Sequence, residues 1–280
     1  MELVKNRQKV LLKVIQGLQN KGISSRRAIV KALFLLKEEY FAGNSVKFYS
    51  FYPYKQGPFS QLCFSDLRKL NAEGMINDSE NMLTDKGIKT ANEMDILEAD
   101  IHHLLGRFNN EKEMLDYVYS KYPSYTVKSQ LVSHKKEQEI GFCTIGYEGK
   151  DIDSFLNVLI QNKISMVIDV RNNAFSMNFC FIGKKLKQYL NDAEIDYIHM
   201  PELGVESEDR ANLNSKEDYE KLFLKYRQSL PLKQKYLDTI EKEGNNKRIA
   251  LLCFEKDVSS CHRREIAKHI RNKGHEVLDL

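Results

Sequence analysis

The sequence predicts two domains: a mainly helical N-terminal domain, followed by an α/β domain with a five-stranded parallel sheet. The chain has 280 residues, more than the usual single domain of about 100 to 200. Residues 1–122 carry apolar side chains at helical spacing, whereas short apolar runs alternate with amphipathic segments from Gly141 onward. We therefore expect domains at 1–122 and 141–280, joined by a polar, lysine-rich linker at 123–140.

Composition places the chain among ordinary globular proteins. Hydrophobic residues make up 42% and charged residues 29% of it, which argues against disorder. Neither a run of about 18 uncharged apolar residues nor a signal-peptide pattern occurs, so we expect a cytoplasmic protein without a membrane partner. His102 and His103 are adjacent on a predicted helix and point apart, so they do not suggest a metal site. The five cysteines are odd in number and scattered, without a Cys-x-x-Cys pair, so we expect free thiols, no metal and no cofactor; they are Cys63, Cys143, Cys180, Cys253 and Cys261.

The first domain reads as helices around one short strand. A first helix ends at Asn20-Lys21-Gly22, and Ser24-Ser25 caps a second. Pro58 fits the first turn of a third helix, which Gly74 ends. The remaining elements are a strand at 48–52, a short hairpin and turn at 75–90, and a helical stretch at 96–122.

Three helices followed by a small β-wing is the order of a winged helix-turn-helix domain. Residues 1–90 hold 15 Lys and Arg against 8 Asp and Glu, whereas residues 141–280 hold 22 of each. A basic first third indicates a polyanionic partner, and we favour DNA. A helical packing domain with solvated charges is the alternative. The third helix would read the nucleic acid with its outward residues Ser60, Gln61, Ser65, Arg68 and Lys69.

The second domain contains five apolar runs that read as strands. Amphipathic helical patterns such as Phe155-Leu156-Leu159-Ile160 and Ile266-Ala267-Ile270 separate them. Strands that are apolar on both faces require helices on both sides of a parallel sheet, so we expect a three-layer, Rossmann-like α/β architecture. The runs are Phe142-Cys143-Thr144-Ile145, Met166-Val167-Ile168-Asp169-Val170, Tyr197-Ile198-His199-Met200, Ile249-Ala250-Leu251-Leu252-Cys253-Phe254 and Glu276-Val277-Leu278-Asp279.

Polar residues follow these strands, and this is where a functional site is expected. Ligands of open parallel sheets bind beyond the carboxyl ends of the strands. The candidates in chain order are Gly146-Tyr147-Glu148-Gly149, Asp169-Val170-Arg171, His199 with Pro201-Glu202-Leu203-Gly204, and Cys253-Phe254-Glu255 with Cys261-His262-Arg263-Arg264.

Cys261 and His262 are expected at a helix N-terminus, where backbone N–H groups and the helix dipole favour negative charge. Such a position lowers the pKa of a thiol and also suits a phosphate or carboxylate. Two readings stay open. In one, Cys261 is a thiolate nucleophile; in the other, it packs inward while His262 and Arg263 hold an anion.

Glu255 ends a buried strand, so desolvation would suit it to general acid/base catalysis, unless it forms a structural salt bridge with Arg171 or Arg263. Asp169 and Arg171 carry the same ambiguity on one face of their strand, and Arg171 could clamp an anionic substrate. His199 reads as a histidine at the edge of the core rather than a catalytic one. The two glycines of Gly146-x-x-Gly149 hint at a phosphate loop or serve only the turn.

The C-terminal half resembles the domain of unknown function 488 family. Five blocks match in order: Thr144-Ile145-Gly146-Tyr147-Glu148-Gly149, Ile168-Asp169-Val170-Arg171, 195–204, Leu251-Leu252-Cys253-Phe254-Glu255 and Cys261-His262-Arg263-Arg264. The resemblance implies an α/β fold in which Asp-x-Arg, Cys-x-Glu and Cys-His-Arg motifs meet. One position departs from the family pattern of Ser-Arg, because here Ser176 is followed by Met177. Residues 52–60 look more loosely like winged-helix modules of prokaryotic regulators and antitoxins.

Three functions compete on these observations. The first is an enzyme that docks on nucleic acid and acts on an anionic nucleotide or sugar-phosphate, as a hydrolase, glycosylase or transferase. Its Glu255 would be the acid/base, with Asp169, Cys261 and His262 as further catalytic candidates; Tyr147, Gly146, His199, Glu202, Cys253, Arg171 and Arg263 would bind the ligand. The second is a DNA-binding regulator that senses such a ligand without catalysis. The third is an antitoxin-like or defence-system component whose α/β domain is silent.

Overall fold

The computed structural model describes residues 4–41, 47–77, 79–93, 97–132, 139–206, 208–210, 213 and 215–280. The chain divides into two compact units, Met1–His134 (unit 1) and Lys135–Leu280 (unit 2), and the division falls inside the predicted linker. Residues 123–132 pack on unit 1, where the Gln130 N–H donates to the Lys55 carbonyl at 2.8 Å. Residues 133–138, the lysine-rich part of that linker, lie outside the described residues.

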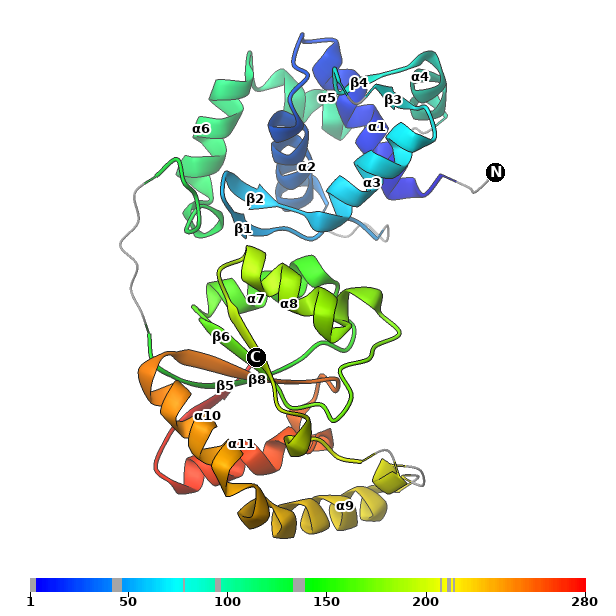
Figure 1. Cartoon of the computed structure of the whole chain (residues 1–280). Helices are drawn as coiled ribbons and strands as arrows, with labels where there is room; N and C mark the ends of the chain where they lie inside the picture. The colour runs from blue at the N-terminus through cyan, green and yellow to red at the C-terminus, as the bar shows by residue number, and fades with distance from the viewer. Residues whose placement is uncertain are drawn as a thin grey trace. The chain divides into compact units, whose positions relative to one another are not determined.

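Unit 1 is mainly helical, as predicted (Figure 1). Its apolar core is built from α1 and α2, whose buried faces follow the helical spacing seen in the sequence. None of the helices among the described residues is long and apolar enough to span a lipid bilayer. The elements are α1 (Asn6–Gln19), α2 (Arg26–Tyr40), β1 (Tyr52–Tyr54), β2 (Gly57–Phe59), α3 (Gln61–Ala72), β3 (Ile76–Asn77), β4 (Met82–Leu83), α4 (Asp85–Asn92), α5 (Glu98–Gly106), α6 (Glu111–Lys121) and η1 (Pro123–Tyr125).

The start of α3 differs from the prediction. Pro58 lies in β2, where it pairs with Pro53 across the β1–β2 hairpin, and does not begin the helix. Ser60 is the N-cap of α3 instead, and its hydroxyl accepts from the Cys63 N–H at 3.2 Å. Because Ser60 is fully buried, our placement of it on the outward face was wrong. Arg68 is exposed, as expected.

Two further segments of unit 1 differ in detail. The predicted hairpin exists as β3 and β4, but residues 85–92 then form α4, which Thr84 caps. The stretch predicted as one helix is two, α5 and α6, because Asn110 caps a new helix by accepting from the Glu113 N–H at 3.0 Å. The expected start of that stretch at residue 96 lies outside the described residues.

Unit 2 contains the predicted five-stranded sheet. All its described strand pairs are parallel, in the order β7-β6-β8-β5-β9. The strands are β5 (Gly141–Gly146), β6 (Met166–Asp169), β7 (Asp196–His199), β8 (Arg248–Cys253) and β9 (Val277–Asp279). The helical elements are α7 (Ile152–Gln161), η2 (Phe179–Phe181), α8 (Gly183–Asp192), η3 (Pro201–Leu203), η4 (Glu208–Arg210), α9 (Lys216–Ser229), η5 (Leu230–Lys233), α10 (Gln234–Asn246), η6 (Val258–Ser260) and α11 (Arg263–Asn272).

Helices cover both faces of this sheet, which confirms the three-layer α/β architecture. Figure 1 shows α7 and α8 on one face and α9, α10 and α11 on the other. Ile168, Val170 and Cys253 belong to the core beneath α9–α11. Since successive side chains of a strand alternate between faces, Asp169 points to the opposite, α7–α8 face. The carboxyl edge of the sheet therefore carries different chemistry on its two faces.

The strand order creates a crevice between β6 and β8. The chain leaves β6 toward β7 at one edge of the sheet, whereas it leaves β8 toward β9 at the other edge. Neighbouring strands whose connections run in opposite directions leave a gap at their carboxyl ends, the usual place for a ligand in open α/β sheets. The fold thus points to the ends of β6 and β8.

A buried lysine is the main electrostatic cost in unit 1. Lys31, on α2, is 3% exposed, and its ammonium donates to the Pro58 carbonyl at 2.9 Å. Burial, with a smaller contribution from the positive charge of Arg27, lowers its pKa to about 7. The unfolded chain would therefore hold more protons than the folded chain between about pH 7 and pH 10.5.

We predict that Lys31→Met stabilises unit 1 near pH 6 and removes a rise in stability with increasing pH. Below about pH 7 the wild-type protein carries the full cost of a buried charge, a few kcal/mol since one pKa unit corresponds to about 1.4 kcal/mol. Loss of the bond to Pro58 offsets about 1 kcal/mol. Calorimetry of the full chain at several pH values measures this, with the exposed Lys89→Met as control. Parallel pH profiles for wild type and Lys31→Met would contradict it.

Candidate functional site

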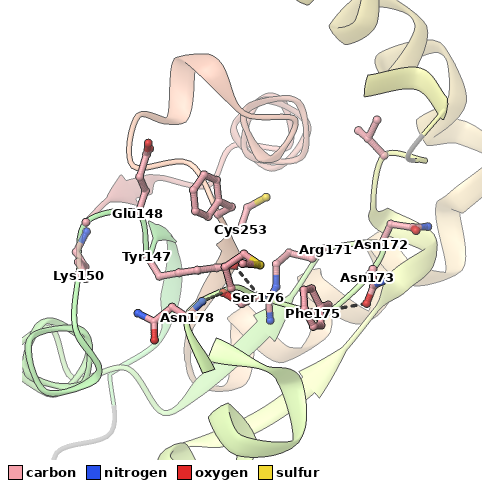
Figure 2. A pocket seen from close by; sticks show the side chains of 14 residues that line it. Tyr147, Glu148, Lys150, Arg171, Asn172, Asn173, Phe175, Ser176, Asn178 and Cys253 are labelled. Carbon is pink, nitrogen blue, oxygen red and sulfur yellow. Dashed lines mark hydrogen bonds between the residues drawn. The ribbon is translucent and has the colours of Figure 1, made fainter. Parts of the chain in front are cut away.

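A cavity of about 600 Å³ lies at the carboxyl ends of β5, β6 and β8 (Figure 2). Its volume is in the range of small-molecule sites, about 300 to 1,000 Å³. The lining combines aromatic, carboxamide and charged side chains from the segments that follow four strands, β5, β6, β7 and β8: Tyr147, Glu148, Gly149, Lys150, Arg171, Asn172, Asn173, Phe175, Ser176, Met177, Asn178, Val205, Cys253 and Phe254.

On the α7–α8 face, Asp169 and Arg171 form a buried ion pair. The Arg171 Nε and Nη2 groups donate to the two Asp169 oxygens at 2.8 and 2.5 Å, and the Tyr197 hydroxyl donates to Asp169 Oδ2 at 2.7 Å. Burial opposes the charge of Arg171, but the Asp169 carboxylate outweighs it and raises the pKa of Arg171. Asp169 is 0% exposed. Its carboxylate holds Arg171 in place, which does not support its prediction as a catalytic group.

The rest of the Arg171 guanidinium shapes the cavity wall. Its Nη1 donates to the Tyr147 hydroxyl at 3.0 Å and to the Phe181 carbonyl at 3.1 Å, and the Tyr147 ring stacks on Phe181 with centroids 4.3 Å apart. With four hydrogen bonds inside the protein, Arg171 is a positioning residue. Arg171 also lines the cavity, so the hypothesis that it contacts an anionic substrate stays a prediction.

On the opposite face, Cys253, Cys261 and His262 form a buried cluster. His262 Nδ1 lies 3.8 Å from Cys253 Sγ and 3.9 Å from Cys261 Sγ. The Cys253 thiol also donates to Glu255 Oε2 at 3.1 Å, which brings the predicted acid/base to the cluster. A hydrogen bond with Cys261, together with burial, holds the pKa of Cys253 well above its ordinary value. Cys253 is therefore a neutral thiol in this environment.

The protonation of the His262 ring follows from its partners. Nε2 lies 3.0 Å from the Val170 carbonyl oxygen. A carbonyl only accepts, so Nε2 carries the proton and Nδ1 presents its lone pair to the two sulfur atoms. His262 is the N-cap of α11 and 2% exposed, so it does not hold an anion from the cavity as one reading expected.

Arg263 holds the loop between β8 and α11. It is 1% exposed and donates to the Glu255 carbonyl at 2.6 Å and to the Lys256 carbonyl at 3.0 Å. With these carbonyls and the Thr144 hydroxyl, 3.4 Å from Nε, as acceptors, the arrangement does not support the reading in which Arg263 holds a ligand anion. The same loop packs on Gly146, where an added Cβ would lie 1.8 Å from the Glu255 oxygen.

The β5–α7 and β8–α11 loops are joined by one backbone–backbone hydrogen bond and one hydrogen bond to the Glu148 carboxylate. The Glu148 N–H donates to the Phe254 carbonyl, and the Lys256 N–H donates to Glu148 Oε2, both at 2.9 Å. Gly149 has a φ of +74°, so the turn itself requires a glycine there. The two glycines of Gly146-x-x-Gly149 thus serve close approach and turn geometry, while Gly149 also borders the cavity.

The loop after β6 supplies polar groups that the sequence analysis missed. Asn173 Oδ1 accepts from the Phe175 N–H at 3.0 Å, and Asn178 Oδ1 accepts from the Cys180 N–H at 3.3 Å. These bonds fix both carboxamides, whose NH₂ groups have no partner among the described residues. Phe175 is 61% exposed, and Met177, at the position that departs from the family pattern, is 94% exposed. An asparagine-rich run directly after a buried strand was the signal available in the sequence.

The other predicted residues lie around this cavity or outside it. Tyr147 and Cys253 line it, and half-buried Glu255 adjoins it through Cys253. His199 Nε2 bonds the Arg171 carbonyl at 2.8 Å and lines a neighbouring, more open cavity. Glu202 is exposed and is not among the residues that line the cavity, and a hydrogen bond from Tyr236 lowers its pKa.

Comparisons with known proteins agree with this second unit. Residues 151–270 match the profile of a family described as Domain of unknown function DUF488. The match covers the Asp169–Arg171 and Cys253–Arg263 segments and starts after the first of the five blocks. The comparisons with curated proteins and with solved structures returned no match. Unit 2 therefore contains a domain of the DUF488 family, as the resemblance in its sequence predicted.

Proposed function

We propose that unit 2 binds an anionic, nucleotide-like ligand in the strand-end cavity, and that unit 1 contacts nucleic acid. The observation that carries the first part is the pairing of exposed aromatic faces, Phe175 and Phe254, with fixed N–H donors in one cavity. Aromatic rings stack on any base, and carboxamide NH₂ groups donate to base or phosphate oxygens. An oxygen-rich ligand with one flat ring matches this lining.

Lys150 gives the cavity its preference for negative charge. Its ammonium donates to the Gly146 carbonyl at 2.9 Å. Burial lowers its pKa, and the neighbouring charges of Lys256 and Arg263 lower it further. A phosphate beside Lys150 would relieve this repulsion, whereas a neutral ligand would not. The ligand would therefore bind more tightly when it is phosphorylated.

We predict that Lys150→Gln weakens binding of a nucleoside monophosphate by about tenfold or more, equivalent to about 1.4 kcal/mol. Binding of the matching unphosphorylated nucleoside should change little, because the lost interaction is with the phosphate. Isothermal titration calorimetry over a set of bases measures both. The control is Lys268→Gln, an exposed lysine of α11. Equal losses for nucleotide and nucleoside would show that Lys150 does not bind a phosphate.

Chemistry on the bound ligand is proposed to depend on Glu255. Its carboxylate accepts from the thiol of Cys253, a residue that lines the cavity, so it stands close to the ligand space. A positioned acid/base contributes about 10²- to 10⁴-fold to a rate. The reaction classes that fit are hydrolysis or transfer at a glycosidic or phosphate bond.

Glu255→Gln should lower turnover by about 10²-fold or more while leaving the Kd of the ligand within a factor of a few. The measurement is product formation by chromatography over nucleotides, modified nucleosides and oligonucleotides, with Glu276→Gln as control. Turnover that survives the substitution would remove Glu255 from the reaction. Absence of turnover in the wild type would favour the ligand-sensing regulator, which needs binding alone.

Unit 1 offers a second basic feature besides α3. A cavity of about 290 Å³ is lined by four basic side chains, Arg26, Arg27, Lys31 and Lys55, together with Tyr54, Phe59 and Phe64. Arg27 is paired with Glu111 at 2.5 Å, whereas Lys55 is exposed and packs its ammonium 5.5 Å from the Tyr54 ring centroid. Basic groups interleaved with aromatic rings suit a phosphodiester chain. This supports contact with nucleic acid near the β1–β2 hairpin as well as at Arg68.

Lys55→Ala and Arg68→Ala should each weaken DNA binding and lower the salt-dependence slope by about 1, because each removes one phosphate contact. Fluorescence anisotropy with a labelled duplex at several salt concentrations measures this, and Lys89→Ala is the control. Repeating the DNA titrations with saturating nucleotide tests the alternative function, a DNA-binding regulator that senses the ligand. A DNA affinity that never responds to nucleotide would reject ligand sensing.

A further inference from the structure

We propose that Cys253, Cys261 and His262 form a binding site for a thiophilic metal ion of the Zn²⁺ class. One Sγ atom from each cysteine and one imidazole nitrogen lie within 4.8 Å of one another, and all three residues are buried. This departs from our expectation of no metal, which rested on the lack of a Cys-x-x-Cys pair. The ligands come from two stretches, Cys253 at the end of β8 and Cys261-His262 between η6 and α11, and only the folded loop between them brings the two stretches together.

The distances fit one central ion. Zn–S bonds of about 2.3 Å and Zn–N bonds of about 2.1 Å at tetrahedral angles separate sulfur from nitrogen by about 3.6 Å. The two sulfur-to-Nδ1 distances are 3.8 and 3.9 Å, close to this value, and the two sulfur atoms lie within 4.8 Å of each other. Two cysteines and one histidine, with a fourth position for a water or ligand, form one of the known three-residue sets of zinc sites.

His262 is oriented as a metal ligand is. A ligating histidine usually donates its second ring N–H to a carbonyl or carboxylate, which fixes the ring and its tautomer. Here Nε2 donates to the Val170 carbonyl at 3.0 Å, and the Nδ1 lone pair is directed between the two sulfur atoms. Thiols are weak hydrogen-bond donors. Among the residues that the structure describes, Nδ1 contacts these two sulfur atoms, and a cation would satisfy its lone pair better than such weak donors.

The backbone around the cluster is held independently of any metal. Arg263 fixes the loop through the Glu255 and Lys256 carbonyls, and this loop returns the chain from the end of β8 to Cys261. The 3₁₀ turn η6 closes with the Cys261 N–H donating to the Val258 carbonyl at 3.1 Å. A site assembled in advance loses little chain entropy when the ion binds.

Binding exchanges two thiol protons for one divalent cation. Each thiol ionises, its sulfur electron pair forms a bond to the metal, and the protons leave to solvent. Two thiolates and an imidazole favour Zn²⁺ over the hard ions Mg²⁺ and Ca²⁺. The inference rests on the geometry of the three ligands and not on the proposed nucleotide-like ligand, although the Cys253 thiol also donates to Glu255 and so connects the two sites. Cys253 also lines the strand-end cavity, so the ion would lie at the cavity border.

The test uses the full chain, reduced and stripped of metal. Zn²⁺ is titrated against a chromophoric chelator, and Co²⁺ is added separately as a spectroscopic probe. We expect one ion per chain and a near-ultraviolet thiolate-to-cobalt charge-transfer band. Cys253→Ser, Cys261→Ser and His262→Gln should each weaken Zn²⁺ binding by more than about tenfold. Cys180→Ser, which changes a cysteine outside the cluster, should leave both readouts unchanged.

Circular dichroism verifies that each variant folds. If His262→Gln does not fold, Cys261→Ser still tests the proposal, because it changes a single sulfur atom to oxygen. Zn²⁺ should also raise the Tm of the wild type but not that of Cys253→Ser. The proposal is overturned if the reduced protein binds no stoichiometric Zn²⁺. This holds also for protein that was isolated with a Cys253–Cys261 disulfide and then reduced. Binding that persists in the Cys253→Ser/Cys261→Ser double variant overturns it as well. Nucleotide titrations of Cys261→Ser test the proposed function separately. Failure of the metal proposal is a loss or absence of Zn²⁺ binding, whereas failure of the proposed function is an absence of nucleotide binding.

Discussion

The placement of the β8–α11 loop on Gly146 positions both the Phe254 side of the cavity and the thiol cluster at the edge of the sheet. Without a side chain at Gly146, the Glu255 carbonyl approaches the end of β5, and Arg263 fixes it there by hydrogen bonds to two successive carbonyls. This contact brings Phe254 to the cavity and Cys261 back to Cys253. A guanidinium used in this way rigidifies backbone, and its burial is matched by charge-assisted bonds. The cavity and the thiol cluster therefore depend on the same loop, β8–α11.

The sheet keeps two kinds of chemistry apart. Alternation along β6 directs Asp169 to the α7–α8 face and Val170 to the α9–α11 face. The Asp169–Arg171 ion pair thus lies on one side of the sheet, and the thiol cluster around His262 lies on the other. Between them lies the crevice that the strand order leaves open between β6 and β8. A ligand in the cavity would touch Arg171 and Cys253, one residue from each side.

The five strands and the start of α11 were predictable because each depends on local pattern: buried runs for strands, and polar residues before an amphipathic helix. The partners of the charged residues were not. Arg171 and Arg263 occur in equally polar motifs, yet Arg171 bonds the neighbouring Asp169 whereas Arg263 bonds two carbonyls that the β8–α11 loop brings near. Helix α4 was not predicted because its polar sequence lacks a continuous apolar stripe. Ser60 was wrongly placed on the outward face because its role as the N-cap of α3 was not recognised.

One peptide segment serves both sides of the sheet. The Val170 carbonyl orients His262, and the next residue, Arg171, carries the hydrogen bonds that hold Tyr147. Energies at the two clusters are therefore not independent, since a displacement of this backbone moves an acceptor on one face and a guanidinium on the other. A ligand in the cavity and a metal ion on the sulfur atoms would therefore each alter the affinity for the other.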